Sequence, residues 1–130
     1  DLQQLQIIKY ISKQLQIPIE IIGIPTKREE SGLAMSSRNK LLSETGLQKA
    51  TLIYQTLKYI KENSDNFTVD QLKKIAIEKF SHQTDVNLEY LEIVSLEKLQ
   101  PISEFKDANE NAACIAASIS SVRLIDNIIF

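Results

Sequence analysis

Residues capable of binding phosphate gather in one short stretch, Gly32-Leu33-Ala34-Met35-Ser36-Ser37-Arg38-Asn39. The hydroxyls of Ser36 and Ser37 can donate hydrogen bonds to phosphate oxygens, and Arg38 adds a planar, permanently charged fork. Gly32 frees the backbone, and Asn39 can close a turn. These are the parts of a polyphosphate clamp. Composition alone favours the alternative, an ordinary solvated loop ahead of a helix, so other segments of the chain must decide.

The segment before this stretch predicts one helix and one strand. The apolar positions of the helix recur every three or four residues and place one face against a core: Leu5, Ile8, Ile11 and Leu15. Asp1 is placed to cap this helix, which should end before Pro18. Residues 19–24 favour a strand, and apolar residues on both of its faces suit a covered parallel sheet. We therefore interpret residues 1–25 as the last α–β unit of a domain whose remainder lies upstream.

The segment after the stretch predicts two helices. Ser43 can cap the first, which should end near Asn63. Its expected buried stripe is Leu47, Ala50, Ile53, Tyr54, Leu57 and Ile60. Thr68 and Gln71 match a capping box at the start of the second helix, which should run to about His82. We read His82 as a surface residue near the helix C-terminus and assign it no catalytic role.

Three strands are expected in the remainder of the chain, at residues 86–94, 112–119 and 122–129. Ser120-Ser121 should join the last two in a short hairpin, although the alanine-rich 112–119 also permits a helix. Helices and strands are segregated rather than alternating, which predicts an α+β fold: an antiparallel sheet of about three strands with helices on one face. Glu89 and Glu92, three positions apart in a strand, should point to opposite faces and form no acid–base pair.

Composition excludes several classes of protein. The 130 residues are 43% apolar, and their formal net charge is −2 with both signs interspersed. That balance argues against a nucleic-acid-binding face and against a polybasic membrane surface, and no apolar run is long enough to span a membrane. The single cysteine, Cys114, lies in a small apolar run and is expected to be a buried spectator. These features indicate a cytoplasmic protein without a metal-binding cysteine or histidine pattern.

Three separated segments of the chain resemble the pantothenate synthetase (pantoate–β-alanine ligase) family, in its C-terminal portion. Asp1-Leu2-Gln3-Gln4-Leu5 is similar to the end of a glycine-lysine-aspartate-aromatic-Gln-Gln segment, with Leu2 where the family usually has an aromatic residue. Residues 22–39, with Arg28-Glu29 and Met35-Ser36-Ser37-Arg38, resemble the family's nucleotide loop. Arg123-Leu124-Ile125-Asp126-Asn127 resembles its terminal strand.

The resemblance implies an adenylate-forming ligase. ATP and pantoate would give pantoyl adenylate and pyrophosphate, and β-alanine would then displace AMP, with Mg²⁺ accompanying the nucleotide and no prosthetic group. It implies ATP contacts at Asp1, Lys27, Met35, Ser36, Ser37 and Arg38, and a pantoate contact at Gln4. Lys27 is expected to act through its main chain. Arg38 is the candidate phosphate stabiliser, because the similar loop of related nucleotidyl transferases carries a lysine that is absent here.

The same resemblance predicts a different role for each of three segments of the chain. Residues 1–25 would close a Rossmann-like nucleotide-binding domain, residues 26–42 would be the ATP-contacting linker loop, and residues 43–130 would be a C-terminal lid. Asp1 rather than Met at position 1 suggests that an N-terminal half is missing. The chain alone should then hold half an active site, no complete catalytic set and no metal ligands, and the full-length protein is expected to be a homodimer. The alternative is an interaction or dimerisation module without ligand affinity of its own.

Overall fold

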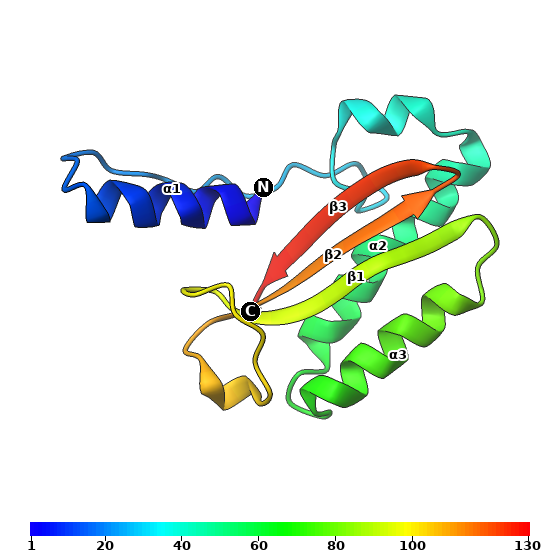
Figure 1. Ribbon diagram of the computed structural model, residues 1–130. Coiled ribbons are helices and arrows are strands. Elements are labelled where there is room, and N and C mark those ends of the chain that lie inside the picture. Colours follow the sequence, from blue (N-terminus) through cyan, green and yellow to red (C-terminus); the bar gives the residue numbers. More distant parts are fainter.

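The computed structural model describes residues 1–130 and contains three α-helices and one three-stranded antiparallel sheet of order β1-β2-β3 (Figure 1). The α-helices are α1 (Leu2–Gln14), α2 (Glu44–Glu62) and α3 (Val69–Ser81). The strands are β1 (Val86–Ser95), β2 (Asn111–Ile119) and β3 (Val122–Ile129), and short 3-10 turns lie at Ser37–Leu41 and Phe105–Asp107. The predicted α+β class is confirmed.

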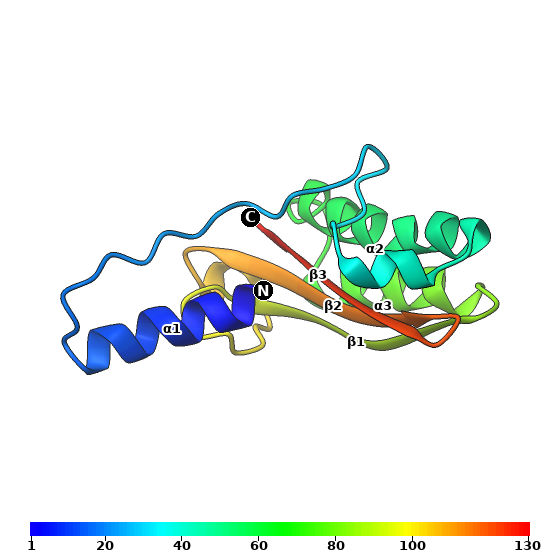
Figure 2. The same ribbon diagram turned by 90° about the horizontal axis from the view of Figure 1, so that it is seen from above.

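Helices α2 and α3 cover one face of the sheet, as Figure 2 shows from above. Four of the six predicted stripe residues of α2 are fully buried in this core: Ala50, Ile53, Leu57 and Ile60. Leu47 is 37% exposed and Tyr54 is half-buried, so the buried stripe is narrower than predicted. The alanine-rich β2 is a strand, and its small residues Ala113 and Ala117 let α2 approach the sheet closely.

Local signals set the ends of these elements as predicted. Ser43 Oγ accepts from Gly46 N at 3.1 Å at the start of α2. Thr68 and Gln71 form the complete capping box of α3, which ends at its C-cap His82. Ser120 and Ser121 join β2 to β3 with φ values of 46° and 69°, the left-handed pair that a tight two-residue hairpin requires.

The prediction that Glu89 and Glu92 point to opposite faces is wrong. The register of β1 against β2 shifts between Leu88 and Tyr90, so a bulge at Glu89 interrupts the alternation of side chains. Glu89 reaches Ser118, whereas Glu92 lies opposite Cys114, and both of these β2 residues lie on the face away from α2. Glu92 is paired with Lys73 of α3 instead of with a second carboxylate.

The N-terminal segment differs from the prediction at two places. Helix α1 forms, capped by Asp1, but its apolar positions Ile8, Ile11 and Leu15 are 46–66% exposed. Residues 19–24 are extended and run back beside α1, but they form no strand, and no main-chain hydrogen bond involves residues 20–26 (Figures 1 and 2). A strand needs a neighbour to satisfy its N–H and C=O groups, and no such neighbour lies beside this segment. Leu2 is the only apolar residue of α1 that is buried, and it packs against Val94 and Ala112 on the open face of the sheet.

Candidate functional site

The linker between α1 and α2 folds into a tight hairpin-like turn before it reaches the serines. Arg28 and Ala34 form an antiparallel bridge, Glu29 N donates to Leu33 O at 2.8 Å, and Met35 N donates to Lys27 O at 2.9 Å. Gly32 has φ 88°, a conformation that side-chain-bearing residues rarely adopt. The turn therefore delivers Met35 and the residues after it to a defined position.

The serine–arginine stretch continues as a short 3-10 turn. Ser36 caps it, with Ser36 Oγ accepting from Arg38 N at 3.2 Å, so the Ser36 hydroxyl hydrogen is still free to donate. Asn39 closes the loop as predicted: Nδ2 of Asn39 donates to Ala34 O at 3.0 Å, and Asn39 N donates to Ser36 O at 3.1 Å. Asn39 Oδ1 is buried and has no hydrogen-bond partner.

A cavity of about 190 Å³ lies between this loop and β3. It brings together four of the predicted site residues from two distant parts of the sequence: Asp1, Met35, Ser36 and Arg38. Residues of β3 complete its wall, and Nη1 of Arg38 donates to Arg123 O at 3.3 Å, which ties the loop to that strand. The arrangement presents hydroxyl, main-chain and guanidinium donors around a small hollow that opens beside the N-terminus of α1.

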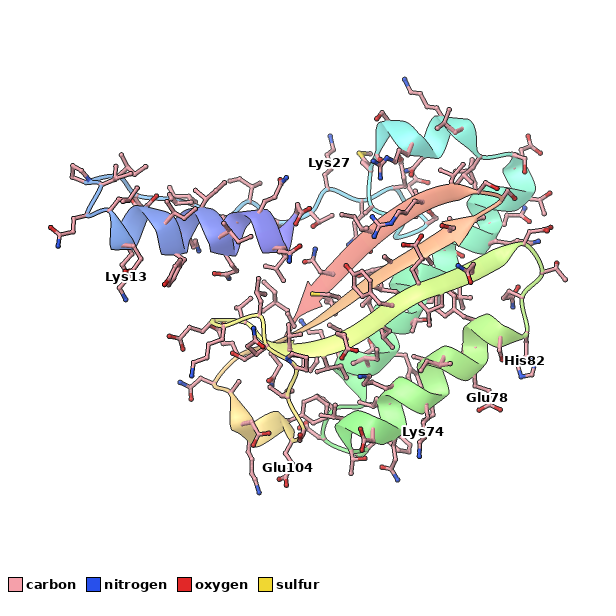
Figure 3. All side chains as sticks on the ribbon, in the orientation of Figure 1. Lys13, Lys27, Lys74, Glu78, His82 and Glu104 are labelled. Carbon is pink, nitrogen blue, oxygen red and sulfur yellow. The ribbon has the colours of Figure 1, made fainter.

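Three predicted site residues lie outside this cavity. The side chain of Lys27 extends away from the sheet (Figure 3), and only its main-chain oxygen takes part in the turn. Ser37 is exposed and does not line the hollow. Gln4 lies exposed on α1, where its main-chain N–H donates to the Asp1 carboxylate at 3.1 Å.

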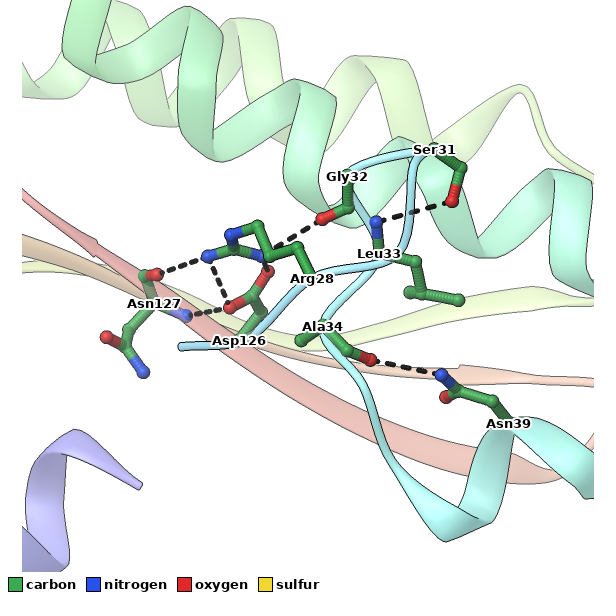
Figure 4. Close-up of polar contacts among 8 residues, drawn as sticks. All are labelled: Arg28, Ser31, Gly32, Leu33, Ala34, Asn39, Asp126 and Asn127. Carbon is green, nitrogen blue, oxygen red and sulfur yellow. Dashed lines mark hydrogen bonds and ion pairs between the residues drawn. The ribbon is translucent and has the colours of Figure 1, made fainter. Parts of the chain in front are cut away.

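The contact that joins the loop to the sheet is not predicted by the sequence. Arg28 forms a bidentate ion pair with Asp126 of β3, which is buried on the helix side of the sheet (Figure 4). Both residues belong to segments that carried the family resemblance, but nothing in their spacing predicted a pair. The available signal was an aspartate at an alternating position between Leu124 and Ile128, because a carboxylate on a buried strand face needs a cationic partner.

Charged and titratable groups also line the open face of the sheet. Hydrogen bonds from Ser118 and Arg123 hold the pKa of Glu89 below its ordinary value, and the bond to Glu89 raises the pKa of Arg123. Burial raises the pKa of the Cys114 thiol to about 11. No three histidine, cysteine, aspartate or glutamate side chains gather as a metal-binding group.

Fold and site together define a small α+β domain whose linker presents a serine–arginine loop at the edge of an antiparallel sheet. The chain matches the family model described as Pantoate-beta-alanine ligase over residues 1–129. It is 42% identical to the pantothenate synthetase of Cytophaga hutchinsonii over 131 residues, which cover 99% of this chain and 46% of that protein. The chain therefore belongs to the pantoate–β-alanine ligase family, which confirms the resemblance seen in the sequence.

Solved structures agree with this assignment. The crystal structure of pantothenate synthetase from Thermus thermophilus matches with a TM-score of 0.88 and 33% identity, over 97% of this chain and 45% of that one. Pantoate-beta-alanine ligase from Francisella tularensis, complexed with beta-gamma ATP and beta-alanine, matches with a TM-score of 0.60 and 31% identity, over 98% of this chain and 40% of that one. The chain thus spans about half the length of the relatives it matches. None of its helices is long and apolar enough to cross a membrane.

Proposed function

We propose that this chain is the C-terminal part of a pantoate–β-alanine ligase, where it supplies the ATP-phosphate loop and a lid over the active site. The observation that carries the proposal is the cavity shared by Asp1 and the Met35–Arg38 loop, since these residues are far apart in sequence and meet only in the fold. The Francisella tularensis relative, whose crystal structure is complexed with beta-gamma ATP and beta-alanine, supports the choice of ligands.

The proposed reaction has two steps. A carboxylate oxygen of pantoate bonds to the α-phosphorus of ATP while the bond to the bridging oxygen of the β-phosphate breaks and pyrophosphate leaves. The amine of β-alanine then bonds to the acyl carbon, AMP leaves with the carboxyl oxygen, and the amine loses a proton. Negative charge grows on the departing pyrophosphate in the first step, so donors fixed before the reaction lower its barrier most.

The loop residues have the chemistry that this step requires. The Ser36 hydroxyl and the free nitrogens of Arg38 can donate to β- and γ-phosphate oxygens, each such charge-assisted bond contributing about 1.5–3 kcal/mol. Ser37 and the Lys27 main chain would contact the nucleotide once the site is complete, and Asp1 lies at its edge. Gln4 would hydrogen-bond pantoate. Mg²⁺ would accompany ATP on its phosphates.

The proposal divides the chain as the sequence predicts. Residues 1–25 would complete an N-terminal nucleotide-binding domain, residues 26–42 would contact ATP, and residues 43–130 would form the lid. The exposed apolar side chains of α1 and of residues 17–24 support this division, since such a surface needs a covering partner. The chain alone would lack pantoate and β-alanine pockets and would be inactive, and the complete enzyme would be a homodimer.

A coupled pyrophosphate-release assay with ATP, pantoate, β-alanine and Mg²⁺ tests the proposal. We expect no turnover from residues 1–130 alone and turnover after the N-terminal half is added in trans. Arg38→Ala should reduce the rate about 100-fold or more, as loss of one preorganised transition-state donor does. Lys40→Ala is the matched control, because Lys40 carries the same charge in the same 3-10 turn but does not line the cavity.

The same assay distinguishes this proposal from the second candidate, a lid or interaction module without ligand affinity of its own. The exposed apolar surface of α1 favours that alternative as well. If the added N-terminal half restores activity and Arg38→Ala matches the wild type, the domain closes the site but binds no phosphate. Turnover by the isolated chain would refute the half-site argument.

A further inference from the structure

The side chain of Arg28 donates four hydrogen bonds, to Gly32, Asp126 and Asn127 (Figure 4). Arg28 Nη1 donates to Asp126 Oδ2 at 2.6 Å and to Gly32 O at 3.1 Å, and Nη2 donates to Asp126 Oδ1 at 3.1 Å and to Asn127 O at 3.2 Å. The two charged side chains are only 19% and 2% exposed. This geometry distinguishes the pair from the exposed ion pairs elsewhere on the surface, which contribute little.

Only an arginine can make this set of bonds. A lysine ammonium is a point charge without the planar fork that meets both carboxylate oxygens. The guanidinium also stacks on Tyr54 of α2, with Cζ 4.0 Å from the ring centroid. The same ring touches Gly32, where an added Cβ would lie 2.2 Å from Tyr54 Cδ1. Arg28, Gly32 and Tyr54 therefore fit one another as a unit.

Within this cluster, Arg28 and Gly32 lie directly before the Met35–Arg38 loop in the chain. The hydrogen bonds from Met35 N to Lys27 O and from Glu29 N to Leu33 O connect Arg28 to Met35 through a closed turn. At the other end of the loop, Arg38 donates to Arg123 O. Both ends are therefore tied to the same strand, β3, whereas the preceding residues 20–26 make no main-chain hydrogen bonds at all.

We infer that Arg28 and Asp126 are positioning residues for nucleotide binding: their ion pair sets the place of the Met35–Arg38 loop on β3. The loop then moves with the lid as one piece, and any change of its position relative to the first half of the enzyme occurs upstream of residue 27. The inference rests on the proposed function, because it concerns how the same loop meets the phosphates of ATP. Asp126 lines the wall of the cavity, but both of its carboxylate oxygens accept hydrogen bonds from Arg28, so the two residues act through the loop that they hold.

Steady-state kinetics of the complete ligase test this role. For Arg28→Ala we expect kcat/KM for ATP to fall by about tenfold to 100-fold, through a higher KM for ATP, a lower kcat or both. A small misplacement of a group that contacts the substrate produces a loss of this size. The KM values for pantoate and β-alanine should stay within about twofold. Arg28→Lys should recover only part of the loss, because it restores the charge without the fork. The double variant Arg28→Ala/Asp126→Ala should have a kcat/KM for ATP no lower than that of Arg28→Ala. The single substitution already removes the ion pair, so the second removes no further interaction between the two residues.

Lys73→Ala is the matched control. Lys73 and Glu92 also join a helix to a strand through a 2.7 Å ion pair, but neither contacts the loop, so its kinetics should equal those of the wild type. If Arg28→Ala does not fold, Asp126→Asn keeps the shape of the carboxylate and decides the question with the same readout. A lower melting temperature with unchanged kinetics for all three substrates would overturn the inference. An inactive wild-type ligase would instead refute the proposed function on which it rests.

Discussion

Residues 43–130 and residues 1–25 are both rich in apolar side chains at regular spacing, yet the structure buries them very differently. The stripe of α2 enters a core shared with α3 and the sheet. The equivalent stripe of α1 is exposed, and the apolar segment that follows it is extended without partners. The difference shows that a periodic pattern specifies which face needs covering, whereas burial depends on whether a second element is present to cover it.

The loop at residues 26–42 lies between these two regions and is fixed to only one of them. Its hydrogen bonds run to β3, within the larger region, through Arg28 and Arg38. Only Asp1, at the start of α1, shares the cavity from the other side. Under the proposed function, this cavity would open or close when the relative position of the two regions changes.

The largest expected contrast comes from the same truncation made in each region. Leu57→Ala removes a side chain that is 0% exposed in the core, and it should lower the free energy of unfolding by about 2–5 kcal/mol. Leu15→Ala, where the side chain is 66% exposed, should change it by less than about 0.5 kcal/mol. Urea denaturation followed by circular dichroism measures both. Equal losses would show that α1 unfolds with the core.

Gly32 in the loop and Gly23 in the N-terminal segment offer a second contrast. Gly32→Ala combines a φ of 88° with a Cβ 2.2 Å from the Tyr54 ring, and it should cost about 1–3 kcal/mol in thermal or urea unfolding. At Gly23 an added Cβ meets only the mobile end of the Leu5 side chain at 2.8 Å, so Gly23→Ala should be nearly neutral. A neutral Gly32→Ala would mean that the turn at residue 32 relaxes without the Tyr54 contact.

Removing a helix cap should change the free energy of unfolding by a smaller amount, and again by different amounts in the two regions. Thr68→Ala removes half of the capping box of α3 and should lower the unfolding free energy by about 1 kcal/mol. Asp1→Ala removes the corresponding cap of α1, and it should leave the main unfolding transition unchanged because α1 has little packing to transmit the loss. Native-state hydrogen exchange would detect the fraying of α1 separately from the core.

Thiol labelling tests whether the open face of the sheet shields Cys114 from solvent. Burial raises the pKa of Cys114 to about 11, so at pH 8 the folded protein should hold the unreactive thiol form, and labelling by a maleimide should be much slower than in urea. The sign follows from the direction of the shift: the protonated thiol favours the folded state below the unfolded value near 9, and this contribution is lost as the pH rises toward 11. Equal labelling rates at pH 8 would show that this face is open to solvent.

Much of the fold follows from local chemistry that the sequence displays. The Ser43 cap, the Thr68–Gln71 box and the Ser120–Ser121 turn each satisfy backbone groups within a few residues, so they could be located without a structure. The three strands of the sheet agree with their predicted bounds to within one residue, because alternating or β-favouring residues and the serine turn mark them in the sequence. The bulge at Glu89 was not, because it depends on the register against β2 and has no glycine or proline to mark it.

The candidate site likewise has features that the sequence predicts and features that it does not. Residue types alone predict phosphate donors at Ser36, Ser37 and Arg38, and they predict the turn-closing role of Asn39 that the structure confirms. The sequence could not determine that Arg28 would meet Asp126, which lies 98 positions away, or that Asp1 would share a cavity with Arg38. Hydrogen bonds within a turn are local properties of the chain, whereas an ion pair between distant segments exists only after the sheet and helices have fixed their separation. The sequence by itself thus determined the elements and the chemistry they carry, and the tertiary structure decided which of them meet, because only packing sets distances between remote residues.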